Sequence, residues 1–407
     1  MKKTLWTKNF TLVTAASALG AVGGIAGGFA LSFLVFDETG STLASALILA
    51  IQLVPFFVLP LFLAPVMDRL PRKPFLVAGD LIDGVLYALM GLYLLKFEFS
   101  YAAYLGYSLL LACLESFDEL AFQSIYPKLI PDGMEQQGYA VSTTLYPILR
   151  VLMLPLAGVL LDAVGAAWIL IGQGGLSLLA ALIESNIDIT EHRWEGGEKL
   201  FTLRQWRADI KEAAEYLKNE RGVTGIFSYM AVTNGVASGY SSILVAFFRT
   251  FPGFTAAMYS LFSVFEFAGR TLGGAVQYKL KIAKEKKFGF TFIVYQIYEL
   301  MDMCLLWLPY PLMLANRALV GFLGANSATM RQAAMQTYIP EELRARLNAF
   351  QNMLVTAASG LFALIIGALG EVLDYRLCVT ICGATAFIAA WLLVWRRRAD
   401  VRKIFEK

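Results

Sequence analysis

Charged residues are scarce in this sequence, in which only 16% of 407 residues are Asp, Glu, Lys or Arg. A soluble domain is about a quarter charged and about half apolar, whereas 58% of these residues are hydrophobic. The apolar residues lie in long runs, and a run of roughly 20 such residues is long enough to cross a bilayer. The composition therefore excludes an ordinary soluble domain and predicts an all-α polytopic membrane protein.

Residues that build metal and redox sites are also rare. The chain has one histidine, His192, and four cysteines, all of which fall inside apolar runs. Cys378 and Cys382 share one helix face but have neither a histidine nor a carboxylate beside them, so they are interpreted as small core residues. We expect no metal and no cofactor, and we interpret His192 as a solvated loop residue.

The dipeptide Gly-Lys is absent from the chain, which excludes a phosphate-binding P-loop and transport driven by ATP bound to this chain. Glycines recur every fourth residue at 20, 24 and 28 and at 23 and 27, inside the first apolar run. Such spacing favours close packing of membrane helices over a nucleotide loop. No enzyme signature is present, and we expect a protein that is not an enzyme.

Twelve apolar runs predict twelve membrane spans. They cover residues 10–36, 42–66, 75–95, 101–125, 139–161, 166–185, 223–247, 256–278, 288–308, 312–337, 347–370 and 376–395. The basic start MKKTLW leads into the first run, which is longer than the core of a signal peptide, so it is interpreted as an uncleaved span.

Lysine and arginine set the predicted orientation. Of the 34 such residues, the loops on one side carry only Lys96, Arg249 and Arg376, and four lie within spans. All the others lie on the opposite side, which is the cytoplasmic side by the positive-inside rule. The sequence thus predicts a cell-membrane protein with both termini in the cytoplasm.

The longest interruption divides the chain into residues 1–185, a linker at 186–222 and residues 223–407. Within the linker, apolar residues recur at helical spacing between basic ones, at Leu203, Trp206, Ile210, Ala213 and Leu217. This pattern predicts an amphipathic helix. It lies either on the inner leaflet or against the protein's own cytoplasmic face.

A charged turn, APVMDRLPRKP at residues 64–74, separates the second and third spans. Its Asp68, Arg69, Arg72 and Lys73 match motif A of the major facilitator superfamily, Gly-x-x-x-Asp-Arg-x-Gly-Arg-Lys, with Ala64 and Pro71 in place of the glycines. Prolines 65, 71 and 74 are expected to stop the helices on both sides. With Thr39-Gly40-Ser41 and Gly79-Asp80-Leu81, the chain resembles the branch that contains macrolide-efflux proteins and the enterobactin exporter.

The resemblance implies a major facilitator fold of twelve transmembrane helices in two six-helix halves. A second, degenerate copy of the motif occurs at Gly273, Gln277 and Lys281, with Gln277 at the position of the aspartate. By resemblance, Arg72 pairs with Asp118 or Glu119 in a gate latch, so the predicted gating residues are Asp68, Arg69, Arg72, Lys73, Asp118 and Glu119. The exporter motif of the fifth span is incomplete here, at Leu154-Pro155-Leu156-Ala157-Gly158.

Charges inside membrane spans are costly and usually mark function or supporting ion pairs. The candidate substrate or proton site consists of Glu115, Arg150, Glu266 and Arg270. Glu266 and Arg270 are four residues apart in the order that favours an ion pair. An ion pair in which the two charges simply neutralise each other is therefore an equally weighted alternative to a functional site. Weaker candidates are the acid pairs Asp80 with Asp83 and Glu299 with Asp302.

These observations predict a proton-coupled secondary transporter that works by alternating access and exports an amphipathic small molecule or drug. Acids outnumber bases within the spans, and aromatic residues accompany them, which would suit a lipophilic cation. Expected partners are the small-molecule substrate, protons and membrane lipids, with no nucleic acid, and the protein is expected to be a monomer. The alternatives are a lipid or glycolipid flippase, a nutrient importer, and a non-transporting receptor or scaffold.

Overall fold

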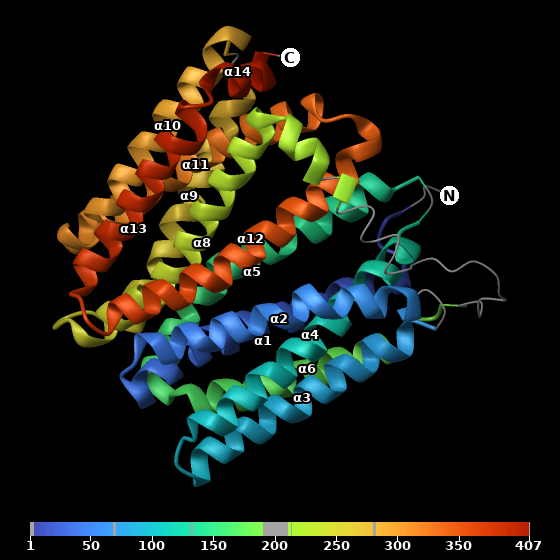
Figure 1. The fold of residues 1–407 in the computed structure, drawn as a ribbon. Helices are drawn as coiled ribbons and strands as arrows, with labels where there is room; N and C mark the ends of the chain where they lie inside the picture. The colour runs from blue at the N-terminus through green and yellow to red at the C-terminus, as the bar shows by residue number, and fades with distance from the viewer. Residues whose placement is uncertain are drawn as a thin grey trace. The chain divides into compact units, whose positions relative to one another are not determined.

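The computed structural model describes residues 4–67, 71–131, 133–189, 211–212, 214–279 and 282–406. Within these ranges nearly every residue is helical and no strand occurs. The chain forms two compact units, which are described separately (Figure 1).

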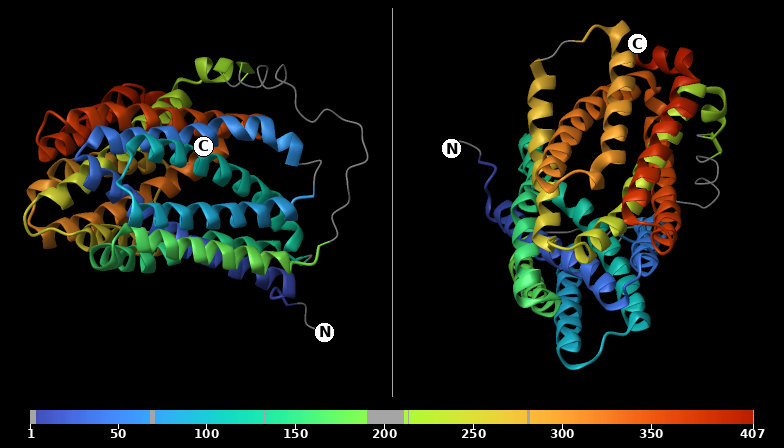
Figure 2. Two further views of the ribbon diagram at one scale, coloured as in Figure 1. Left: turned by 90° about the horizontal axis from the view of Figure 1, so that it is seen from below. Right: turned by 90° about the vertical axis from the view of Figure 1, so that its left-hand side faces the viewer.

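The first unit comprises Met1–Gly40, Ile51–Leu200 and Pro252–Ser260. Its helices are α1 (Lys8–Thr39), most of α2 (Thr42–Met67), α3 (Lys73–Lys96), α4 (Tyr101–Leu129), α5 (Glu135–Val164) and α6 (Ala166–Ser185). Helix α6 packs against both α3 and α1, while α1 also packs against α5. Figure 2 shows from two further sides that α3 and α6 lie side by side.

The second unit comprises Ser41–Ala50, Phe201–Phe251 and Leu261–Lys407. Its helices are α8 (Arg221–Thr250), most of α9 (Ala256–Lys279), α10 (Lys284–Cys304), α11 (Tyr310–Tyr338), α12 (Glu341–Gly370), α13 (Tyr375–Ala389) and α14 (Arg398–Glu406), with short 3-10 and π segments at Leu305–Trp307 and Ala390–Trp395. Helix α13 packs against α10 and α8, and α8 packs against α12. The contacts repeat the order of the first unit, as expected of two related halves.

The prediction of a polytopic helical membrane protein is confirmed. Each of the twelve predicted spans coincides with a helix, which a 3-10 segment continues in the ninth span and a π segment in the twelfth, and the ends lie within a few residues of the predicted ones. Eight helices within the described residues are long and apolar enough to cross a membrane. The chain is therefore an all-α polytopic membrane protein of twelve principal helices.

The prolines of the charged turn act differently from the prediction. Helix α2 continues through Pro65 to Met67, so this proline does not end it. Proline is tolerated within membrane helices because neighbouring groups satisfy the freed backbone carbonyl. Pro74 behaves as expected and lies in the first turn of α3, where its missing N–H costs no hydrogen bond.

The glycines of the first span do not all serve helix packing. A side chain added at Gly23 would lie 3.2 Å from Cγ of Gln173 on α6, so this face requires a small residue. By contrast, Gly20, Gly24 and Gly28 have open space beside them, so the packing prediction is wrong for that row. A close backbone approach in the first unit occurs instead between α3 and α6, where a Cβ at Gly174 would lie 2.6 Å from the carbonyl oxygen of Gly84.

The core of the second unit extends beyond the spans. Val401, Ile404 and Phe405 of α14 are buried against a cluster that includes Phe288 and Leu217. The amphipathic pattern of the linker thus contributes Leu217 to this core. Its other apolar positions, Leu203, Trp206, Ile210 and Ala213, lie outside the described residues.

Candidate functional site

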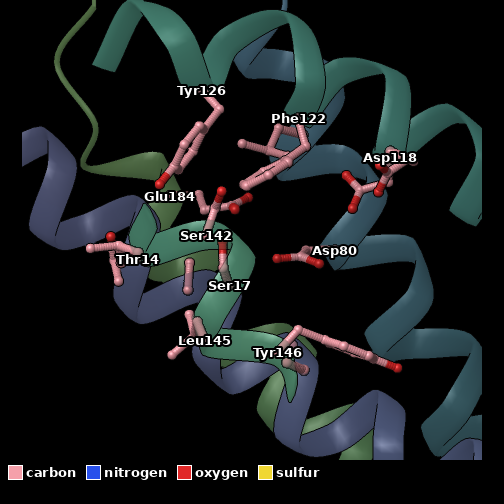
Figure 3. A pocket seen from close by; sticks show the side chains of 16 residues that line it. Thr14, Ser17, Asp80, Asp118, Phe122, Tyr126, Ser142, Leu145, Tyr146 and Glu184 are labelled. Atoms are coloured by element: carbon pink, nitrogen blue, oxygen red, sulfur yellow. The ribbon is translucent and has the colours of Figure 1, made fainter. Parts of the chain in front are cut away.

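The first unit contains a cavity of about 460 Å³ between α1, α3, α4, α5 and α6, which we call the acidic cavity (Figure 3). Four carboxylates line it, those of Asp80, Asp118, Glu119 and Glu184. Among the described residues that line it, none is a lysine or an arginine. The ionisable carboxyl groups of the acidic cavity thus have no basic side chain beside them among the described lining residues.

Three helices bring these acids to one end of the unit. Asp80 lies about two turns after the start of α3, Glu184 lies in the last turn of α6, and Asp118 faces them from α4. Lys73 Nζ donates a hydrogen bond of 2.8 Å to the carbonyl oxygen of Ser185, which satisfies an acceptor at the end of α6. The cavity thus lies near the basic start of α3.

The acids project into shared space. Figure 3 shows the carboxylates of Asp80 and Glu184 directed into the same cavity, and the two groups are close enough to interact. Glu184 is 3% exposed. Its Oε2 and the Oδ1 of Asp118 are buried and accept no hydrogen bond from any residue that the structure describes. Such acceptors are costly unless a proton or a cationic group satisfies them.

Part of the wall is aromatic and hydroxylic. The rings of Phe122 and Tyr126 lie 5.0 Å apart between centroids, and the hydroxyl of Tyr126 donates 2.8 Å to the carbonyl oxygen of Gly138. Tyr146 and the hydroxyls of Ser17 and Ser142 complete this wall. Aromatic faces beside carboxylates suit an organic cation, since both attract positive charge.

The second unit has its own cavity of about 280 Å³, which we call the mixed-charge cavity. Its charged lining comprises Glu266, Arg270, Glu299, Asp302, Arg317 and Arg331. Glu266 Oε1 lies 2.7 Å from Arg270 Nη2 on the same helix, and Asp302 forms an ion pair with Arg317 of α11. This cavity contains both signs of charge, unlike the acidic cavity.

The predicted gating residues are only partly within the described structure. Asp68 and Arg69 lie outside the described residues, whereas Arg72 and Lys73 lie at the start of α3. Glu119 accepts a hydrogen bond from the side-chain amide of Gln123. The latch remains a prediction.

The predicted mid-membrane site is spread over both units. Glu115 accepts a hydrogen bond of 3.5 Å from the hydroxyl of Tyr87, and Asp83 is on the neighbouring turn of the same helix as Tyr87. Arg150 is exposed on α5 in the first unit, whereas Glu266 belongs to the second unit and is paired with Arg270. A site joining Arg150, Glu115 and Glu266 remains a prediction.

Sequence reasoning missed Glu184, Arg317 and Arg331 as members of cavities. Glu184 ends the sixth span on the same side as Asp80 and Asp118, and this shared depth was a usable signal. Arg317 and Arg331 belong to the tenth span, and their partners come from other helices, so no spacing within the sequence reveals them.

Comparison with known proteins bears on the fold. One bacterial structure, a homologue of the human lysosomal transporter Spinster in an inward-facing, unoccupied conformation, has 14% identity and a TM-score of 0.67, covering 98% of this chain and 94% of its own. A POT peptide transporter in complex with alafosfalin has 11% identity and a TM-score of 0.73, covering 100% and 98%. The nucleoside transporter NupG has 11% identity and a TM-score of 0.69, covering 96% and 99%.

No curated protein matches the chain. A sequence model described as the Major Facilitator Superfamily matches residues 11–297 and 297–406, which is nearly the whole chain. The twelve helices and the repeated packing of the two units agree with that match. The chain belongs to the Major Facilitator Superfamily and is a membrane transporter rather than an enzyme.

Proposed function

We propose that this transporter exports an amphipathic organic cation from the cytoplasm in exchange for protons. The observation that carries the proposal is the acidic cavity, in which four carboxylates and three aromatic rings surround about 460 Å³. This volume is in the range of small-molecule sites. The account places the substrate in this cavity during alternating access.

Charge selects the substrate class. At an effective dielectric constant of about 20, two unit charges 4 Å apart interact by about 4 kcal/mol. A cation in the acidic cavity gains from several carboxylates, while an anion meets only repulsion. The rings of Phe122, Tyr126 and Tyr146 supply apolar and π surface for the rest of the molecule.

The distribution of positive charge supports export as the proposed direction of transport. The acidic cavity is at the end of the first unit that carries Arg72, Lys73 and Lys128. The positive-inside rule assigns that end, and both chain termini, to the cytoplasmic side of the cell membrane. A substrate would then enter from the cytoplasm. The resemblance of Thr39-Gly40-Ser41 and Gly79-Asp80-Leu81 to the branch of macrolide-efflux proteins and the enterobactin exporter supports the same direction.

The proposed transporter works as two halves of a single chain. We infer that residues 1–185 and 223–407 form the two moving halves, joined by the linker at 186–222, and that a monomer suffices. In this account Asp68, Arg69, Arg72 and Lys73 control when the cytoplasmic side opens. Asp118 and Glu119 serve both the gate and the acidic cavity, since both line that cavity.

Transport into proteoliposomes tests the proposal. An acidic vesicle interior should drive ethidium inward in exchange for protons. This uptake is measured as the fluorescence of ethidium bound to DNA enclosed in the vesicles. A pH dye outside should report protons leaving together with ethidium uptake. Labelled lipid that moves while ethidium does not would indicate a flippase, and no flux of either would indicate a receptor or scaffold. Both results would contradict the proposal.

A further inference from the structure

Glu299 of α10 is a buried acid in the mixed-charge cavity. The residue is 2% exposed, and its Oε1 accepts a hydrogen bond of 3.3 Å from the hydroxyl of Tyr229 on α8. The Tyr229 hydroxyl in turn lies 3.2 Å from that of Tyr298. No lysine or arginine of the described residues forms an ion pair with Glu299.

The other two acids of this cavity already have cations. Glu266 is held by Arg270 through two contacts, of 2.7 Å and 3.0 Å, within α9. Asp302 is held by Arg317, which is 3% exposed. Removing either negative charge by protonation would leave an arginine without its partner. Glu299 can take up a proton without that penalty.

One arginine of the mixed-charge cavity contacts a tyrosine rather than a carboxylate. Arg331 of α11 donates a hydrogen bond of 3.1 Å from Nη1 to the hydroxyl of Tyr295, and its guanidinium lies 6.0 Å from the centroid of that ring. The tyrosine is a neutral partner. Arg331 is therefore a positive charge in the same cavity that forms no ion pair with a carboxylate of the described residues.

Among the described residues that line the cavity, helices α8 and α13 bring no charged group. Helix α8 contributes the phenol of Tyr240 to the cavity, and α13 contributes the thiol of Cys382. Helix α13 approaches closely here, since a Cβ at Gly383 would lie 3.0 Å from the carbonyl oxygen of Glu299. The walls on these two sides thus supply neutral groups.

We propose that Glu299 binds the proton that drives transport, so that proton and substrate occupy separate sites in the two halves. This inference rests on the proposed exchange of a cation for protons. The step is a transfer of one proton from water on one side of the membrane to the Glu299 carboxylate, and later to water on the other side. No other bond forms or breaks.

The charges of the cavity link this step to movement. With its proton bound, Glu299 is neutral and needs no cation, which agrees with the absence of an ion pair to Glu299 among the described residues. An ionised Glu299 in a membrane-embedded cavity requires a partner, and Arg331 is the cation held only by a phenol. Release of the proton therefore draws Arg331 from Tyr295 toward Glu299, which shifts α11 against α10.

Glu299→Gln tests the assignment, since glutamine keeps the shape and can still accept from Tyr229 but cannot carry the proton. We expect this variant to lose ethidium uptake driven by a pH gradient, together with the accompanying proton flux. Exchange of ethidium between the two sides without a gradient should be retained. Glu285→Gln, the same change at the exposed start of α10, should leave both activities intact.

The two proposals fail in different ways. If the unmodified protein exchanges no ethidium, the proposed function is wrong. If it exchanges ethidium and Glu299→Gln remains fully driven by the pH gradient, the assignment of the proton to Glu299 is wrong. Loss of coupling in Glu266→Gln, or in Asp80→Asn, with coupling retained in Glu299→Gln would place the proton at those acids instead.

Discussion

The carboxylate of Glu371 accepts a hydrogen bond of 2.9 Å from the backbone N–H of Leu43. It also accepts from the hydroxyls of Ser41, at 2.7 Å, and Thr42, at 3.1 Å. An acid that follows the end of α12 therefore caps the first turn of α2, about 330 residues away in the sequence. A carboxylate at this position satisfies free N–H groups and complements the helix dipole.

Removing this cap should destabilise the second unit. Glu371→Ala is expected to lower the free energy of unfolding by about 1 kcal/mol, the usual value of a helix cap. The measurement is the thermal unfolding midpoint in detergent. The control is Glu38→Ala, which changes an exposed acid of α1 that has no side-chain hydrogen bond among the described residues. It should leave the midpoint unchanged.

The contribution of Glu371 should depend on pH. Burial acts to raise the pKa of this carboxyl, but the hydrogen bonds from Leu43, Ser41 and Thr42 outweigh it and hold the pKa below its usual 4.5. A lowered pKa in the folded state stabilises the fold above the usual pKa and loses that effect as the pH falls through the lowered value. The difference between the native protein and Glu371→Ala should therefore shrink below about pH 4.5. A constant difference would contradict the role of the charge.

The contact of α3 with α6 gives a second prediction. Gly174→Ala places a methyl group against the backbone oxygen of Gly84 and the backbone nitrogen of Ala88, neither of which can move alone. Overpacking of this kind costs about 1–3 kcal/mol. Gly175→Ala, one residue further on α6, meets open space and should be neutral or slightly stabilising. Equal melting temperatures for the two variants would contradict the close approach.

The ion pairs of the mixed-charge cavity should differ in strength. Asp302→Ala leaves the buried guanidinium of Arg317 without its carboxylate, which costs about 3–5 kcal/mol for a buried pair. Arg270 and Glu266 are 56% and 30% exposed, so Arg270→Ala should cost at most about 1 kcal/mol. Thermal unfolding of the two variants measures the contrast. A larger loss for Arg270→Ala would contradict the assigned burial.

Hydrophobic length determined what the sequence could predict about the fold. The twelve spans follow from apolar runs of bilayer length, and the Glu266–Arg270 pair follows from a spacing of four on one helix. The partner of Asp302 could not be predicted, because Arg317 is on another helix and only packing brings them together. Glu371 and Leu43 illustrate the same limit over a much longer separation.

The candidate site was predicted only in part for the same reason. Asp80 and Asp118 stood out as acids within spans. Spacing in the sequence relates residues on one helix, however, and does not show which acids on three different helices meet in one cavity. Glu184 counted among the acids of the spans but was not assigned to the candidate site, whereas in the structure it lines the acidic cavity and is 3% exposed. The position of a residue within a predicted span gives its depth in the membrane. The direction that its side chain faces depends on how the helices pack.

Binding of a lipophilic cation to the acidic cavity is the most direct test of the account. Tetraphenylphosphonium should bind the purified protein in detergent, and tetraphenylborate, of similar shape and opposite charge, should not. Asp80→Asn and Glu184→Gln should each weaken binding of the cation by about tenfold, or about 1.4 kcal/mol, while Glu38→Gln should leave it unchanged. Equal binding of cation and anion, or full affinity for the cation in both cavity variants, would contradict the account.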